Sequence, residues 1–264
     1  MALSTIIPRS EDRPLLRVGG AMTVFGALTA ALGNVLHPRS TTYYDDPAAW
    51  LDHNAHSSVW FGSHVLILLG TIALVAAMVS LSRSLAGTRG DGIGQLALVN
   101  AVIGSIVMIV LLVIDGLVVA ELNDVWVAHA ERSSDAVLSG TILYYTIFNL
   151  LYVSMITLFG LAPILYGVSM LLSGTFSRWF GWVGVVVGSA VVGGALLSMV
   201  DISRKVLDAK VWPITSTLVV VWFMTIGIQL WRRAGAGPAG GDVGANGTQP
   251  GARHSDGVPA LTGA

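Results

Sequence analysis

The sequence predicts an all-α, polytopic membrane protein, a bundle of about six transmembrane helices. Of its 264 residues, 54% are hydrophobic and only 11% are charged, and the mean hydropathy is +0.74. A soluble domain of this length could not enclose so much apolar side chain. The apolar residues also gather into runs of roughly 20 residues or more, the length that a helix needs to cross a hydrocarbon core about 30 Å thick.

The runs define the predicted elements, at residues 15–36, 59–81, 93–120, 137–172, 180–200 and 211–231. The fourth run is too long for one straight crossing, because as a helix it would reach about 54 Å. Either Pro163 kinks this helix, or its first turns stand outside the bilayer. In the fifth run, Gly184 and Gly188 predict close packing against a neighbouring helix.

The distribution of positive charge predicts the orientation. Nine of the 14 lysines and arginines fall on the side of the two termini and five on the other side, namely Arg39, Arg132, Arg204, Lys205 and Lys210. Cytoplasmic segments retain the excess of positive charge. We therefore expect a multi-pass protein of the cell (plasma) membrane with both termini in the cytoplasm.

This topology divides the chain into three parts. A cytoplasmic N-terminus covers residues 1–14, and a transmembrane domain covers 15–233, with an outer loop at 38–57. The segment 234–264 is rich in glycine, proline and alanine, so it has too few apolar side chains to order a core. We expect it to be a disordered cytoplasmic tail.

Composition excludes several kinds of site. The chain has no cysteine, so disulfides and thiolate ligands are ruled out, and any metal must be held by His, Asp, Glu or Tyr. The net charge is −1 with scattered basic residues, which argues against binding of nucleic acid. The expected surroundings are the lipid bilayer, and the sequence does not identify a partner subunit.

Histidines gather near the predicted outer face, at His37, His53, His56, His64 and His129. Asp46 and Pro47 are typical of a helix start. If that helix runs on into the second span, His53, His56, Trp60 and His64 form one stripe. Alternatively, His53 and His56 are solvated and Trp60 is an interfacial anchor.

Two ionisable residues lie more than one turn inside predicted spans, where charged groups are costly and are functional by default. They are His64 and Asp115, the predicted catalytic residues, with Asp115 as general acid and a histidine as base. Imidazole and carboxylate also suit Zn, Fe, Cu or Mn. We therefore predict a transition-metal or haem site with candidate ligands His37, His56, His64 and Asp115.

Other polar side chains in the outer half of the bundle predict a pocket that opens outward. The candidate substrate contacts are Trp60, Tyr145, Asn149 and Tyr152. A small or lipophilic ligand would reach this pocket from the outer leaflet. Two classes of function remain open: a membrane-embedded, oxidoreductase-like enzyme that uses metal or acid/base chemistry, and a non-enzymatic carrier, proton-coupled transporter or accessory subunit.

Three stretches carry a resemblance to a known group of proteins. They are LFGLAPILYGVSMLLSGTFSRWFGWVGVVVGSAVVGGAL, HSSVWFGSHV and the IDG of the third run. They resemble uncharacterised multi-span membrane proteins of actinobacteria, which are grouped as a domain of unknown function. The resemblance implies a bacterial inner-membrane protein of about six helices, and it implies no catalytic residue.

Overall fold

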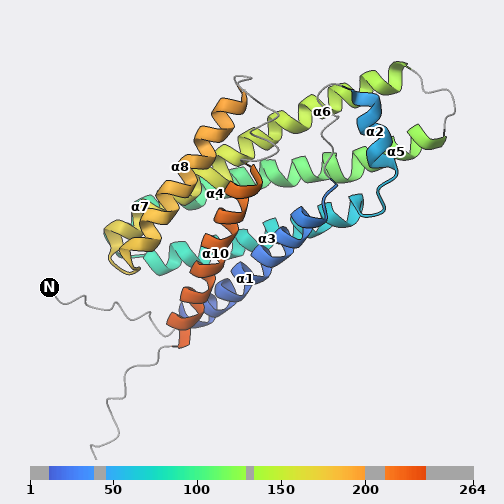
Figure 1. Cartoon of the computed structure of the whole chain (residues 1–264). Helices are drawn as coiled ribbons and strands as arrows, with labels where there is room; N and C mark the ends of the chain where they lie inside the picture. The colour runs from blue at the N-terminus through green and yellow to red at the C-terminus, as the bar shows by residue number, and fades with distance from the viewer. Residues whose placement is uncertain (1–11, 39–45, 129–133, 200–211, 236–264) are drawn as a thin grey trace, which may run out of the picture.

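The computed structural model describes residues 12–38, 46–128, 134–199 and 212–235, and these residues form helices and no strand. Figure 1 shows them. In chain order they are α1 (Arg13–Leu36), α2 (Pro47–Ala55), α3 (Trp60–Leu85), α4 (Asp91–Val113), η2 (Ile114–Val118), α5 (Val119–Ala128), α6 (Ser134–Ser154), η3 (Met155–Leu161), α7 (Ala162–Ser173), α8 (Arg178–Met199) and α10 (Trp212–Gly235). The predicted disordered tail, apart from residues 234–235, lies outside the described residues.

The predicted fold class is confirmed. Five helical segments are long and apolar enough to cross a membrane, and they match the first five predicted runs: Arg13–Leu36, Trp60–Leu85, Asp91–Ala128, Asn149–Ser173 and Arg178–Met199. The sixth run coincides with α10, which is not among those five but has 24 residues and is therefore about 36 Å long.

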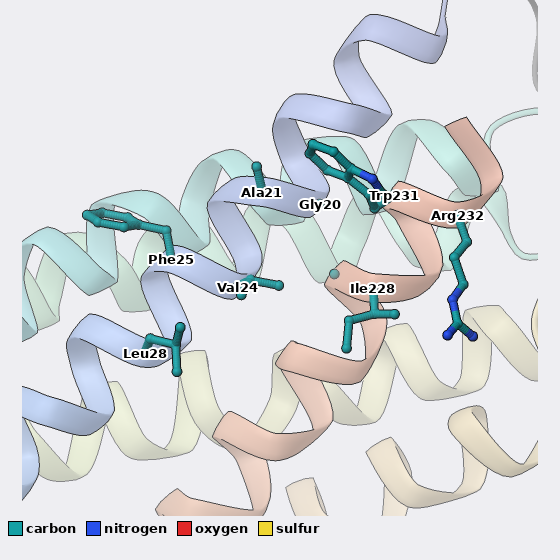
Figure 2. A pocket seen from close by; sticks show the side chains of 9 residues that line it. Gly20, Ala21, Val24, Phe25, Leu28, Ile228, Trp231 and Arg232 are labelled. Atoms are coloured by element: carbon teal, nitrogen blue, oxygen red, sulfur yellow. The ribbon is translucent and has the colours of Figure 1, made fainter. Parts of the chain in front are cut away.

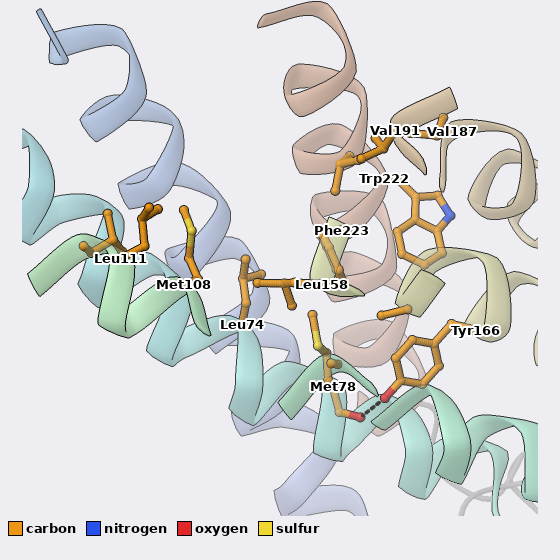
Figure 3. Packing of buried hydrophobic residues seen from close by; sticks show 14 of the residues in the cluster. Leu74, Met78, Met108, Leu111, Leu158, Tyr166, Val187, Val191, Trp222 and Phe223 are labelled. Atoms are coloured by element: carbon orange, nitrogen blue, oxygen red, sulfur yellow. Dashed lines mark hydrogen bonds between the residues drawn. The ribbon is translucent and has the colours of Figure 1, made fainter. Parts of the chain in front are cut away.

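The long helices form a closed ring. Contacts run from α1 to α3, on to α4, then to the α6–η3–α7 helix, to α8 and α10, and back to α1. Figure 3 shows apolar side chains in the interior of this ring, among them Leu74, Met78, Leu158 and Phe223. Helix α1 begins and α10 ends at the same end of the bundle (Figure 1), which fits the prediction that both termini lie on one side.

Two tight turns at that end depend on glycine. Gly87, between α3 and α4, has a φ of 73°, and Gly174, which ends α7, has a φ of 66°. This left-handed conformation is strained for residues with a Cβ atom. The Gly174 N–H donates to the carbonyl of Met170 at 3.3 Å, so the glycine caps the helix as it reverses direction.

Glycines also bring the helices close together. A Cβ atom on Gly26 of α1 would lie 2.8 Å from the carbonyl oxygen of Gly70 on α3. The predicted close packing at Gly184 and Gly188 is confirmed, because a Cβ on Gly188 would lie 2.5 Å from the carbonyl oxygen of Gly160. Backbone contacts of this kind are typical of membrane helices, where small residues let two backbones approach.

The fourth run is one continuous helix of α6, η3 and α7, with wide π-helical turns over Met155–Leu161 just before Pro163. A proline has no N–H to donate to the preceding turn. The missing hydrogen bond at Pro163 explains why the helix widens just before it. The third run has the same construction, with η2 between α4 and α5. Its 38 residues reach about 57 Å, so part of it must extend beyond a hydrocarbon core of about 30 Å.

Helix α2 joins these two long helices at the end of the bundle away from the start of α1, where it contacts both α5 and α6. Asp46 begins α2 as predicted, since its side chain accepts hydrogen bonds from the backbone N–H groups of Ala48 and Ala49. Helix α2 buries Trp50 and Leu51. It therefore forms a cap at the end of the bundle opposite to the start of α1 (Figure 1).

Candidate metal centre

Three of the predicted ligands meet beside this cap. His37 directly follows α1, His64 lies in the second turn of α3, and Asp115 lies in η2. Each can offer one ligand atom, and these three atoms all lie within 4.8 Å of one another. Nε2 of His64 is 3.0 Å from Oδ2 of Asp115, and the rings of His37 and His64 have centroids 4.8 Å apart. We call this group the triad.

The triad is shielded from solvent. The side chain of His64 is 3% exposed and that of Asp115 is 16% exposed, while His37 is half-buried. Desolvation penalises an isolated charge, so a buried imidazole and carboxylate need a proton or a metal ion between them, or a compensating ion pair. The site therefore has the donor set and the low-polarity surroundings of a buried metal centre.

Backbone carbonyls orient both histidines. Nδ1 of His64 lies 2.8 Å from the carbonyl oxygen of Trp60, and Nδ1 of His37 lies 2.8 Å from that of Pro38. A carbonyl oxygen can only accept, so Nδ1 carries the proton in each ring. In a neutral ring Nε2 then holds the lone pair. Metal-binding histidines usually have this arrangement, in which the second ring nitrogen donates to a carbonyl or carboxylate.

The contact between His64 and Asp115 then needs a positive charge. With Nδ1 protonated, neutral His64 presents a lone pair to the carboxylate, and two acceptors 3.0 Å apart repel each other. A proton between them or a metal ion beside them removes the repulsion. Atoms that each lie about 2.1 Å from one ion are at most about 4.2 Å apart, so two ligand atoms at the 4.8 Å limit of the triad must approach each other by at least about 0.6 Å to bind one metal ion.

Trp60 contacts every member of the triad. Its indole N–H donates to the backbone carbonyl of Asp115 at 3.0 Å. Its ring lies against those of His64 and His37, with centroid distances of 4.7 and 5.3 Å. Trp60 is 5% exposed and packs around the triad, and its role as a substrate contact stays a prediction.

Asp115 lies in the π-helical turns of η2, where the helix is wider than a regular α-helix. In η2 the N–H of Val119 donates to the carbonyl of Ile114, five residues earlier. Such turns disturb the regular ladder of helix bonds and are frequent at functional sites. The next residue, Gly116, leaves room for the histidine, because a Cβ there would lie 2.7 Å from Cβ of His64. Sequence reasoning missed this role of Gly116, although the IDG triplet contains it.

The fourth predicted ligand, His56, lies apart from the triad because the helix is broken before α3. Helix α2 ends at Ala55 and α3 begins at Trp60, so the expected continuous stripe through His53, His56, Trp60 and His64 does not form. A tight turn, in which the N–H of Ser57 donates to the carbonyl of Asn54, breaks the helix. His56 is exposed, bonds to the carbonyl of Asp52 through Nδ1, and does not join the triad.

The candidate substrate contacts on α6 do not form one surface. Tyr152 is buried at 1% exposure, whereas Asn149, three residues earlier, is exposed. The side chain of Tyr145 lies outside the described part of the structure. Of the described side chains, Asn149 and Tyr152 therefore do not face the same surroundings, and the substrate pocket stays a prediction.

Comparison of the chain with protein-family models, curated protein sequences and solved structures found no match. The function must therefore be argued from the triad and its surroundings.

Proposed function

We propose that this membrane protein binds one divalent transition-metal ion at His37, His64 and Asp115, and that the metal supports chemistry on a small or lipophilic substrate. The observation that carries the proposal is the convergence of three ligand atoms within 4.8 Å, from three segments far apart in the sequence. Two imidazoles and one carboxylate suit Zn²⁺ and Fe²⁺.

Three protein ligands leave coordination positions for water, dioxygen or substrate. A metal with such open positions acts as a Lewis acid or lowers the pKa of bound water. The ligand set therefore supports an enzyme better than a purely structural metal site, which is usually closed by four protein ligands. Because the triad lies in the bundle, a lipophilic substrate could reach it from the bilayer.

The residues on the inner side of the triad also favour an enzyme over a transporter. Within the described ranges, the core below it holds apolar side chains such as Leu74, Met108, Leu111 and Leu158 (Figure 3). Its buried polar residues include Thr71, Ser105 and Ser154, and none of the buried residues there is an aspartate, glutamate, lysine or arginine. A transport pathway needs polar groups or water on both sides of its binding site.

Metal analysis of the detergent-purified chain tests the proposal. We expect about one Zn or Fe per chain, bound during expression or taken up on titration. His64→Ala and Asp115→Ala should each abolish stoichiometric binding. His53→Ala is the matched control, because His53 is exposed on α2 and should keep the metal. A wild-type chain that neither contains nor binds Zn²⁺, Fe²⁺ or Mn²⁺ would contradict the proposal.

The 3.0 Å contact between His64 and Asp115 also supports a second function. With a proton in place of the metal, the two residues form an imidazolium–carboxylate pair, as found in proton-coupled carriers. This function predicts metal-free protein and solute-driven proton uptake into proteoliposomes, which Asp115→Asn would abolish. It is the weaker candidate, because the described core below the triad buries no aspartate, glutamate, lysine or arginine that could relay the proton further.

A further inference from the structure

A groove of about 550 Å³ lies between α1 and α10, at the end of the bundle opposite to the triad. Figure 2 shows Val24 and Leu28 from α1 and Ile228 from α10 along this groove. Leu28 and Ile228 are 53% and 42% exposed, so the groove is open to the surroundings of the bundle. In a membrane these surroundings are lipid.

Two glycines produce the groove. A Cβ on Gly20 would lie 2.8 Å from the carbonyl oxygen of Gly227 and 2.9 Å from the backbone nitrogen of Trp231. The two backbones therefore touch at this level, and the larger side chains beside the glycines stand apart from one another. The result is a furrow with apolar walls, long enough to run from Gly20 to Leu28, which is about 12 Å along α1.

One end of the groove is cationic. Arg232 lines it and extends from the same side of α10 as Ile228, one turn away (Figure 2). Arg17, one turn before Ala21 on α1, is exposed at the same end. Arg233 does not contribute, since its guanidinium lies over the ring of Phe176 at 3.9 Å. The lining contains no carboxylate to neutralise Arg232.

Trp231 lies at the same level as Arg232 and is 53% exposed. Exposed tryptophans of membrane proteins collect at the boundary between hydrocarbon and headgroups. The groove thus presents, in order, the cation Arg232 in its lining with Arg17 one turn beyond, an interfacial indole and an apolar furrow. A phospholipid has the matching order of phosphate, glycerol backbone and acyl chain.

We infer that this groove binds an anionic phospholipid, with the phosphate against Arg232 and Arg17 and one acyl chain along Val24, Leu28 and Ile228. Polybasic sites near a membrane surface attract anionic lipid by about 1 kcal/mol per arginine. A transmembrane helix from a second copy fits less well. A two-fold contact at this groove would bring the arginines of the two copies together without a described carboxylate between them.

Native mass spectrometry tests the inference. The chain is released from nanodiscs that contain equal amounts of phosphatidylglycerol and phosphatidylcholine. We expect one phosphatidylglycerol to remain bound. Arg232→Gln should lower its occupancy about five-fold relative to the wild type, as expected for the loss of one arginine near the surface. Ala21→Trp, which fills the furrow, should also lower it.

Arg178→Gln is the matched control, because Arg178 is an exposed arginine at the start of α8 outside the groove, and it should leave the occupancy unchanged. Size-exclusion profiles verify that each variant is folded. Equal retention of both lipids, or equal loss in the control, would overturn the inference. So would a dimer that Ala21→Trp disrupts, because it would identify a second copy as the occupant.

Discussion

Trp60 links the three residues of the triad at the scale of single side chains. Its carbonyl accepts from Nδ1 of His64, its indole N–H donates to the carbonyl of Asp115, and its ring packs against His37. Removing any one of these contacts would free a member of the triad to move. Residues in such supporting positions typically change metal affinity 10- to 100-fold when they are altered.

Trp60→Phe should therefore weaken metal binding about 10-fold or more. The phenyl ring keeps part of the packing but leaves the Asp115 carbonyl without the indole donor, at a cost of about 1 kcal/mol in stability. Titration with Zn²⁺ and a thermal melt measure the two effects. Trp222→Phe is the control, since it removes an equivalent bond to the carbonyl of Phe180 far from the triad. If both variants lose affinity equally, Trp60 has no specific positioning role.

The sequence indicated which residues to examine at the site, but not how they meet. His64 and Asp115 stood out because ionisable residues are costly inside a span. His37, His64 and Asp115 follow no short motif, so only the packing of α1, α3 and η2 brings them together. His56 is a fourth candidate ligand in the sequence, two helical turns before His64, and the break between α2 and α3 carries no strong helix-breaking residue that would place it. Packing of this kind depends on the whole bundle and cannot be deduced from spacing.

At the scale of elements, the long apolar runs predicted the spans well, since the length of a hydrophobic helix is set directly by the bilayer. The π-helical turns of η2 and η3 were not predicted. Near Pro163 a local disturbance was expected, but η2 contains no proline, and its only small residue is Gly116. A π turn depends on tertiary contacts such as the bond from Trp60 to Asp115, so the local sequence does not specify it.

Helix α2 covers the triad at its end of the bundle. The ring of Trp50 meets that of Trp60 edge-on, with centroids 6.5 Å apart. Leu51 is fully buried and lies against α6, where a Cβ on Gly140 would be 3.1 Å from it. With nine residues, α2 is too short to be stable alone, so these contacts hold it in place.

Leu51→Ala should therefore release α2 from the bundle. Truncating a buried leucine costs about 2–5 kcal/mol of stability. Here the substitution weakens mainly the packing of one short helix, α2, against the bundle. We expect hydrogen exchange of the α2 amides to become much faster, while exchange in α8 stays unchanged. His53→Ala, on the exposed face of the same helix, should behave like the wild type. Unchanged protection of α2 in Leu51→Ala would show that other contacts hold the cap.

For the whole molecule, the structure establishes which features share an end of the bundle, and the charge distribution predicts which end faces the cytoplasm. The triad and α2 lie at one end, and the turns at Gly87 and Gly174 lie at the other with the start of α1 (Figure 1). If the positive-inside rule holds, the triad faces the outside of the cell and the proposed lipid groove lies in the cytoplasmic leaflet.

The absence of native cysteine makes this orientation directly measurable. His53→Cys on α2 and Ser177→Cys, just before α8, each introduce one exposed thiol, at opposite ends of the bundle. A membrane-impermeant maleimide should label His53→Cys in intact cells and Ser177→Cys only after permeabilisation. The wild-type chain, which has no thiol, is the background control. The reverse pattern would invert the topology: the triad would then face the cytoplasm and could draw on cytoplasmic metal and substrate, and the lipid groove would lie in the outer leaflet.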